Sequence, residues 1–486
     1  NSLYTFDIKE KKVINRFPLG GEGYTCLLSN DEKTLFITCW GCDKVILFDT
    51  KKQQFSGWIP VGDNPNDICV TRNDKFLFVA NANDNSVSVI SLEQKRVIEI
   101  LNSALYPNSP SGSTTNGVAL SPDEKTLYIA NADNNCLAVF DVGQPGKSFS
   151  KGFIPTGWYP TSVKTLGNNI LVSCGKGLTS KANPYGPSPL DKEEEVEHHK
   201  EMSNKHIKVQ YIGGLFRGTL QVLPKPSEQQ LGIFSKAVYE NCPYVKEKEM
   251  VSAGEEGNPI PRRVGESSPI KYVFYVIKEN RTYDQVLGDM PEGNGDSTLV
   301  LFGKNVTPNL HAIAKQFVLL DNFYVSGKCS AEGHQWTDAS IVTDYVEKDV
   351  RAWIRSYPHV QEDALVYTPS GFIWDNAVKH GKKVQIYGEA STPQYDEKHT
   401  WTSIYNCFLK NEKFEFTNHT TIKPVEAILS QTYPSYDDHR IPDALRAKAF
   451  IDELNKYENM DGDQLPELMV MALPNDHTGG TRPGLP

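Results

Sequence analysis

The stretch SPDEKTLYIANADNNCLAVFDV (121–142) decides the fold of the N-terminal half of the chain. A turn with an Asp leads into a β-rich run, and an Asn/Asp turn then leads into a second alternating run. The other copies of this theme are SNDEKTLFITCWGCDKVILFDT (29–50), TRNDKFLFVANANDNSVSVISL (71–92) and the shorter GWYPTSVKTLGNNILVSCGKG (157–177). Asp31, Asp74 and Asp123 mark the period at 43 and 49 residues. Such periods, with about four short strands each, are typical of β-propeller blades.

The C-terminal half alternates strand-like and helix-like runs. KYVFYVI (271–277) is a continuous apolar run, as expected for a strand that is buried on both faces of a parallel sheet. Further strands are predicted at 317–325, 382–389 and 467–474, and helices at 306–316, 370–381 and 443–457. This alternation predicts an α/β domain with a mostly parallel sheet.

The two halves are joined by a helix and a linker. Residues 227–244 predict a helix with Ser227 as its N-cap, and residues 251–269 are rich in Gly, Pro and Ser. We therefore expect a propeller over 1–225, a helix and linker over 226–269, and an α/β domain over 270–486.

Composition and charge exclude some partners. The 486 residues carry a net charge of −10, and no cluster of basic residues stands out, so we expect no nucleic-acid partner. The longest apolar runs have six residues, far short of the roughly 20 that a membrane-spanning helix needs. The nine cysteines include one CxxC pair, Cys39 and Cys42, for which buried free thiols are favoured over a metal site.

Polar side chains follow several of the predicted strands in the C-terminal half. Glu279 follows the first strand, Glu389 a middle one, and Asp476 and His477 the last. Ligands of open α/β sheets bind beyond the carboxyl ends of the strands, and carboxylates with an imidazole suit a divalent metal. The alternative is that these residues cap helices and finish turns.

The N-terminal repeats resemble the YVTN-type β-propeller family. The strand that gives the family its name occurs here as FVAN (78–81) and YIAN (128–131). The resemblance covers about residues 1–225 and implies a propeller, of which four or so blades are visible.

The C-terminal half resembles the phospholipase C/acid phosphatase-type phosphoesterases of the alkaline phosphatase superfamily. The most specific string is IKENRTYDQVLGDMPEGNGD (277–296), because that family shows an ENRSFD-like string after its first strand. The likeness continues through TPNLHAIAKQFVLLDNFYVSG (307–327) to LPNDHTGG (473–480). It implies an alkaline-phosphatase-like α/β domain over about 270–486.

The phosphoesterase resemblance also implies functional residues. Glu279 and Asn280 would supply metal ligands, and Asp476 and His477 would bind metal or phosphate. Arg281 would contact the substrate. The metal would be a divalent ion, with Zn, Mn, Mg, Ca and Fe all open.

The nucleophile would lie shortly after the FYVSG string. The family places Thr or Ser there, and Ser330 fits that position best. Ser326 and Cys329 are rivals, because the sequence departs from the commoner Thr-Pro-Asn pattern. His334 and Glu332 are near enough in sequence to assist Ser330 as acid, base or phosphate contact.

The implied activity is metal-dependent hydrolysis of a phosphate ester through a phosphoseryl intermediate, in the periplasm, at the cell surface or outside the cell. The chain begins at Asn1 within a strand-like pattern and stops at Pro486 in a Gly/Pro-rich loop, so we expect a fragment at both ends. Family members carry a further strand with an acidic pair and another Asp-His after the Asp-His loop, so we also expect an incomplete metal site. The alternative is a binding protein whose propeller recognises a protein or surface ligand and whose C-terminal domain is inactive or regulatory.

Overall fold

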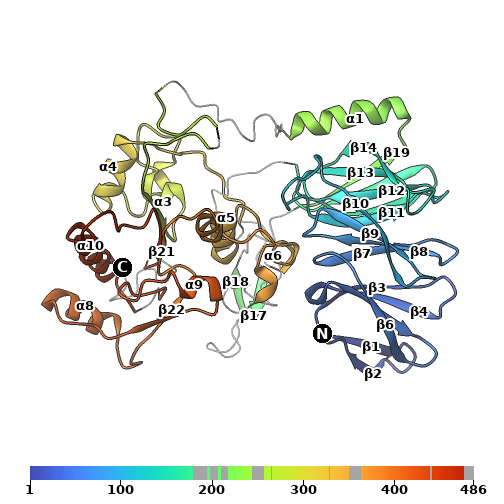
Figure 1. The fold of residues 1–486 in the computed structure, drawn as a ribbon, viewed down its shortest axis with the longest axis horizontal. Coiled ribbons are helices and arrows are strands. Elements are labelled where there is room, and N and C mark those ends of the chain that lie inside the picture. The colour runs from blue at the N-terminus through green and yellow to red at the C-terminus, as the bar shows by residue number, and fades with distance from the viewer. Residues whose placement is uncertain are drawn as a thin grey trace. The chain divides into compact units, whose positions relative to one another are not determined.

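Antiparallel β-sheets follow one another along the N-terminal half of the chain (Figure 1). The three four-stranded sheets are β3 (Gly23–Leu28), β4 (Thr34–Cys39), β5 (Lys44–Asp49) and β6 (Gln54–Pro60); β7 (Pro65–Val70), β8 (Phe76–Asn81), β9 (Ser86–Ser91) and β10 (Arg96–Asn102); and β11 (Thr115–Leu120), β12 (Thr126–Asn131), β13 (Cys136–Asp141) and β14 (Phe149–Pro155). The smaller sheets are β1 (Ser2–Asp7) with β2 (Lys12–Pro18); β15 (Pro160–Leu166), β16 (Asn169–Cys174) and β19 (Thr219–Pro224); and β17 (Glu194–Glu197) with β18 (His206–Val209). The all-β prediction for this half is confirmed.

The computed structural model describes residues 1–178, 194–197, 206–209, 217–242, 257–263, 265–327, 329–349, 363–437 and 440–475. The chain divides into two units. The propeller unit comprises Asn1–Glu249, Ile341–Ser356 and Leu365–Ser370, and the α/β unit comprises Met250–Ser340, Tyr357–Ala364 and Gly371–Pro486. The predicted boundaries at 225 and 269 stay predictions. In the part of the chain that is described, no helix has the length and apolar character to cross a membrane.

The first turn of each repeat shows that the predicted equivalence of Asp31, Asp74 and Asp123 is wrong for the middle repeat. Ser29 Oγ donates to Asp31, and Ser121 Oγ donates to Asp123 in the same way. In the middle repeat, however, Thr71 Oγ1 bonds to Asn73. Asn73, and not Asp74, is therefore the equivalent of the two aspartates, because the next residue of each turn is the one with positive φ. The sequence alone could not show this, since Asn and Asp both form such turns.

The second turn of each repeat connects one sheet to the next. Asp43, Asn85 and Asn135 have φ values of 49°, 51° and 53°, a left-handed conformation that Asn and Asp tolerate better than most residues. Their side chains accept hydrogen bonds from backbone N–H groups at the start of the following sheet, and the bond from Ser113 to Asn85 Oδ1 measures 2.7 Å. The same local sequence thus forms the turn and attaches the next blade.

The hydrophobic core of the propeller unit lies between successive sheets. One cluster joins Val45 and Leu47 of β5 to Leu77 and Val79 of β8. Comparable clusters join the β7–β10 sheet to the β11–β14 sheet, and that sheet to the β15–β16–β19 sheet. β9 and β12 are buried at every residue, so both faces of these strands are covered, including the polar residues that alternate along β9.

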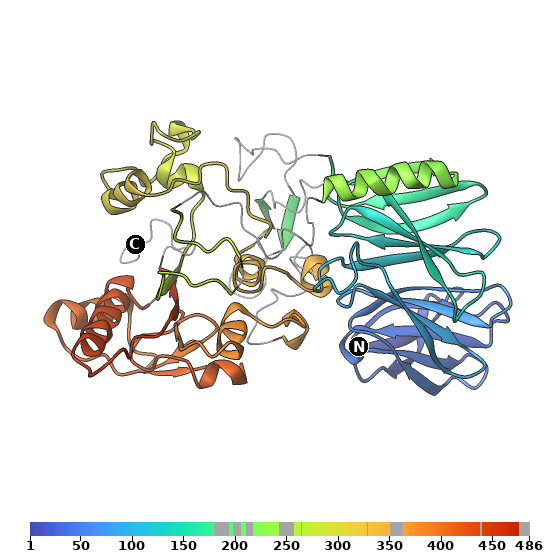
Figure 2. The ribbon, with the colours of Figure 1, turned by 45° about the horizontal axis from the view of Figure 1, so that its top comes forward.

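Helix α1 (Glu228–Asn241) packs on β14 (Figure 2). Ser227 is its N-cap as predicted, and it forms a capping box with Gln230. Ser235 Oγ accepts a hydrogen bond from the Phe153 N–H at 2.8 Å, which fixes the helix to the strand. Leu231 is buried in the cluster that α1 covers.

A segment that is distant in sequence packs into the propeller unit. It includes α6 (Asp344–Asp349). Asn66 Nδ2 donates to Asp344 Oδ2 at 3.2 Å, and Lys176 pairs with Glu347 at 3.0 Å. Asp344 and Glu347 are at most 1% exposed. This segment therefore places two buried carboxylates among polar side chains of the blades.

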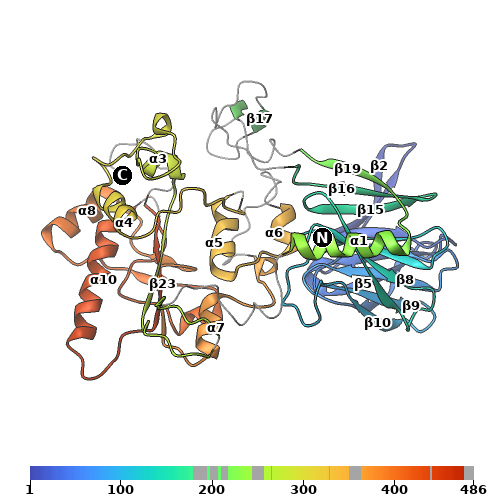
Figure 3. The same ribbon diagram turned by 90° about the horizontal axis from the view of Figure 1, so that it is seen from above.

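A three-stranded parallel sheet is the centre of the α/β unit. Its order is β20 (Val273–Lys278), β24 (Leu468–Leu473) and β21 (Val384–Tyr387), which confirms the parallel sheet in the α/β half. The helices are α3 (Tyr283–Leu287), α4 (Pro308–Gln316), α5 (Ser330–Ala339), α7 (Ile373–Lys379), α8 (Trp401–Lys410), α9 (Lys423–Glu426) and α10 (Asp443–Glu458), and a small sheet joins β22 (Thr392–Gln394) to β23 (Thr417–His419). α8 and α10 lie side by side (Figures 1 and 3).

Two expectations for the α/β unit are wrong. β20 is not buried on both faces: Val273, Phe274 and Val276 are 46–48% exposed, because β20 is an edge strand of the described sheet. Residues 317–325 form no strand. Their apolar side chains, except that of Leu319, are exposed, and an apolar run without a hydrogen-bonding partner strand cannot form a sheet.

Candidate functional site

Four polar side chains meet at the carboxyl edge of the parallel sheet in the α/β unit. Glu279 follows β20 directly, and Glu389 follows β21 after Gly388. His334 and Asp338 lie on α5, one helical turn apart, and therefore on the same face of that helix. The prediction that polar residues after separate strands converge is confirmed for Glu279 and Glu389.

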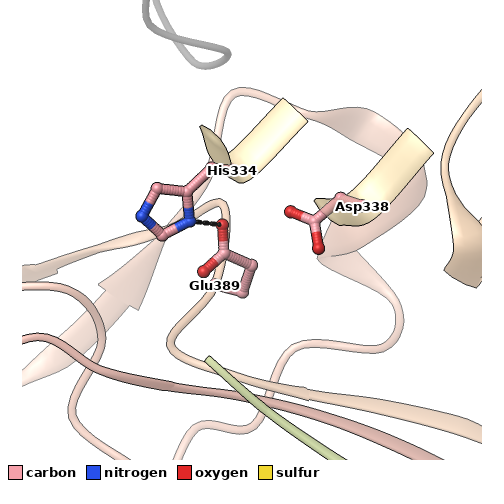
Figure 4. Close-up of side chains that lie close together, drawn as sticks. All are labelled: His334, Asp338 and Glu389. Atoms are coloured by element: carbon pink, nitrogen blue, oxygen red, sulfur yellow. Dashed lines mark hydrogen bonds and ion pairs between the residues drawn. The ribbon is translucent and has the colours of Figure 1, made fainter. Parts of the chain in front are cut away.

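The imidazole of His334 lies between the two glutamates. Its Nδ1 is 2.9 Å from Glu389 Oε1, and its Nε2 is 3.1 Å from Glu279 Oε1 (Figure 4 shows the bond to Glu389). The Tyr436 hydroxyl donates to the same Glu279 oxygen at 2.8 Å. One side chain thus connects the ends of two strands that are far apart in sequence.

These contacts define the protonation state of His334 in the chain without a ligand. A carboxylate accepts hydrogen bonds, so both ring nitrogens donate and the ring is an imidazolium. Burial by itself lowers the pKa of His334, but the carboxylates of Glu389 and Glu279 outweigh it and hold that pKa well above its ordinary value.

Asp338 completes the cluster. It is 3% exposed, and burial, together with the charge of Glu389, raises the pKa of its carboxyl group well above the ordinary value. Within the described residues, no hydrogen-bond donor reaches Asp338 Oδ1 or Glu389 Oε2. Gln335 is 2% exposed, and its amide atoms also lack a hydrogen-bond partner in that part of the chain. The site therefore buries polar atoms whose hydrogen-bonding capacity is unused.

His334, Asp338 and Glu389 have the donor set of a divalent metal site. Each offers one ligand atom, and these atoms lie within 4.8 Å of one another. One imidazole nitrogen and two carboxylate oxygens suit several first-row divalent ions. The side chains present therefore fit the cation that the sequence analysis predicts, although the ligands differ from the predicted set.

Ser330, the predicted nucleophile, is the first residue of α5 and is partly exposed. It is four residues before His334, so both lie on one face of the helix. The rival Cys329 is the N-cap of α5, and the rival Ser326 is exposed in the non-helical segment before it. The helix N-terminus favours an anionic group beside Ser330.

The remaining predicted residues do not all join the cluster. Asn280 follows Glu279 and is partly buried, and the Arg281 guanidinium lies 4.9 Å from the Phe302 ring centre. Asp476 and His477 lie outside the described residues. Asn475, just before them, accepts a hydrogen bond from the Asp443 N–H and donates to the Ile441 carbonyl, so it fixes the start of α10.

Sequence reasoning missed Asp338 and Tyr436. Asp338 had a usable signal, because a histidine and an aspartate spaced i, i+4 on a helix share a face. Tyr436 had none. It lies outside every predicted strand and helix, and only the folded chain brings its hydroxyl to Glu279.

Comparisons with known proteins bear on the propeller alone. Residues 25–176 match the family model described as lactonase, 7-bladed beta-propeller. This match supports the propeller fold of the N-terminal half, whereas the YVTN type stays a prediction. A search of curated proteins finds no match. The phosphoesterase resemblance of residues 270–486 also stays a prediction.

Similar solved structures include hydrazine synthase of Kuenenia stuttgartiensis, with 26% identity, a TM-score of 0.27, and coverage of 32% of this chain and 45% of that one. A protein of Bacteroides uniformis, provisionally named a 6-phosphogluconolactonase, has 19% identity, a TM-score of 0.31, and coverage of 36% and 57%. A protein of Lactobacillus plantarum has 18% identity, a TM-score of 0.32, and coverage of 35% and 56%. The chain spans about half the length of these proteins, and TM-scores this low carry no argument about function.

Proposed function

We propose that the α/β unit hydrolyses a phosphate ester with the help of a divalent cation, and that Ser330 is the nucleophile. The observation that supports this most strongly is the cluster of Glu279, His334, Asp338 and Glu389 at the carboxyl edge of the sheet. On α5, His334 and Asp338 follow Ser330 by about one and two helical turns. An anionic substrate at Ser330 and a cation at the cluster would therefore be close to each other.

The reaction has two displacements at phosphorus. Ser330 Oγ forms a bond to phosphorus, the bond to the alcohol oxygen breaks, and the serine proton passes to solvent. The alcohol oxygen takes a proton from water. A second water then attacks the phosphoserine, which releases phosphate and restores the hydroxyl group. A bound divalent cation would neutralise phosphate charge and favour the alkoxide form of the serine.

Hydrolysis of p-nitrophenyl phosphate and of bis-p-nitrophenyl phosphate by the full chain with Mn²⁺ or Zn²⁺ tests the proposal. We expect Ser330→Ala to lower kcat by at least about a thousandfold, because no covalent intermediate can form. Ser326→Ala and Cys329→Ala should retain most of the rate. Full turnover by Ser330→Ala, or turnover that survives removal of all metal, would contradict the proposal.

A second candidate is lactone hydrolysis by the propeller unit. The observation that favours it is the match of residues 25–176 to a lactonase family model. The same preparations distinguish the two candidates. Acid release from gluconolactone that is unchanged in Ser330→Ala would assign a lactonase activity to the propeller unit, separate from any phosphoesterase activity.

A further inference from the structure

We propose that His334, Asp338 and Glu389 together bind one divalent transition-metal ion, and that Glu279 acts as a positioning residue for the His334 ring. The inference deepens the proposed function and rests on it for its catalytic consequence. Cation binding itself is measured without turnover, so the two proposals fail separately.

The first support is the geometry of the three side chains. His334 and Asp338 project from adjacent turns of α5, and Glu389 faces them from the loop after β21 (Figure 4). The His334 Nδ1 to Glu389 Oε1 distance is 2.9 Å, which is close to the separation of two ligand atoms on one ion of this size. Binding needs loss of the Nδ1 proton and little movement of the backbone.

The second support is independent of the clustering. Asp338 and Glu389 are 3% and 4% exposed, and each has a carboxylate oxygen that no donor among the described residues reaches. An unpartnered polar atom in such a buried place costs free energy unless something satisfies it. A cation between the two oxygens would satisfy both.

The third support is the contact on the far side of the ring. Metal-binding histidines usually donate their other N–H to a carboxylate or carbonyl, which orients the ring. Glu279 Oε1 occupies this place for His334 Nε2, and the Tyr436 hydroxyl holds Glu279 in turn. Glu279, predicted as a metal ligand from the resemblance, would then act through His334.

The ligand set favours some ions over others. An imidazole nitrogen suits Zn²⁺, Fe²⁺ and similar ions, whereas Ca²⁺ and Mg²⁺ prefer oxygen ligands alone. Three protein ligands leave a coordination position for a water molecule or a phosphate oxygen. His334 would then serve as a ligand, and its predicted role as catalytic acid or base would fall to solvent.

Titration of the metal-free full chain with Mn²⁺, Zn²⁺ and Co²⁺ by calorimetry tests the inference, with the Co²⁺ absorption spectrum as a report on the nitrogen ligand. We expect one equivalent to bind to the wild type. Asp338→Asn combined with Glu389→Gln should weaken binding by more than about 100-fold, and Glu279→Gln by about 10- to 100-fold. Glu426→Gln, an exposed charge-matched control in the same unit, should bind like the wild type.

The outcomes separate the two proposals. Unchanged affinity in the double variant, or a folded wild type that binds no ion, would overturn the inference and would favour a proton shared between Asp338 and Glu389. Metal-dependent hydrolysis of a phosphate ester by a double variant with unchanged affinity would leave the proposed function in place, because the cation would then bind elsewhere. Hydrolysis by a wild type that binds no ion would contradict both proposals. For Glu279→Gln, weaker binding at an unchanged melting temperature of the metal-free chain identifies a positioning role, whereas lower stability with unchanged affinity contradicts it.

Discussion

His334 shows how one side chain can compensate two buried charges. Glu279 and Glu389 come from the ends of different strands, and their side chains are 12% and 6% exposed. Carboxylates that are buried together repel each other, and each loses hydration. The imidazolium between them offsets both effects. The sequence indicated a polar strand end at each glutamate, but the histidine that joins them follows from the position of α5 in the folded chain.

Removal of this ring should destabilise the metal-free chain. In His334→Ala both glutamates lose a charged donor, and breaking a buried charge network in this way costs about 3 kcal/mol. Thermal unfolding of the α/β unit in the presence of a chelator measures the loss. His380→Ala is the matched control, because the His380 ring is exposed and, among the described residues, its side chain bonds locally to the Asn376 carbonyl. Equal stability of the two variants would rule out the compensating role of His334.

Among the elements, α1 and the blade strands followed local sequence rules, whereas residues 317–325 did not. The start of α1 was predictable because Ser227 and Gln230 satisfy its first N–H groups within three residues. Residues 317–325 have the same apolar character as a strand but lack a partner in the described sheet. Hydrogen bonds between strands depend on residues far away in the chain, so composition alone could not decide that case.

The cap of α1 gives a prediction at this scale. Ser227→Ala should lower the stability of the propeller unit by about 1 kcal/mol, because the N–H of Gln230 loses its acceptor and the capping box opens. Urea unfolding followed by intrinsic fluorescence reports the change. Lys236→Ala, on the exposed side of the same helix, controls for general surface substitution. A loss in the control as large as that in Ser227→Ala would contradict the capping argument.

At the scale of the whole molecule, the chain passes from one unit to the other more than once. The segment with Asp344 and Glu347 follows α5 in sequence but packs among the blades. The sequence analysis identified no repeat or motif around Asp344 and Glu347 that would have predicted this packing. Contacts of this kind form between residues hundreds of positions apart, and a pattern within one segment contains no information about them.

The packing of Asp344 and Glu347 among the blades makes the stability of the propeller unit depend on pH. Burial, followed by the charge of Glu347, raises the pKa of Asp133 to about 7; Asp344 adds to the rise, and Lys176 opposes it. The unfolded chain has a lower pKa at this position, so between about pH 4 and pH 7 the folded state binds more protons. The stability of the propeller unit should therefore decrease as the pH rises through this window.

Asp133→Asn isolates the effect. Asparagine has no proton to lose, so the variant should gain stability relative to the wild type as the pH rises from about 4 to about 7. Melting temperatures across this range, with the exposed Glu93→Gln as control, measure the difference. A constant difference between Asp133→Asn and the wild type would show that Asp133 is not the titrating group.

The turn residues Asp43, Asn85 and Asn135 have one more consequence. In each repeat, this turn residue supplies the side-chain oxygen that accepts a hydrogen bond from a backbone N–H at the start of the next sheet. Each of these junctions between neighbouring sheets therefore depends on a turn residue of the earlier sheet. A gene duplication that copied one whole repeat in frame would also copy its turn residue, so the new repeat would carry the hydrogen-bond acceptor for the sheet that follows it.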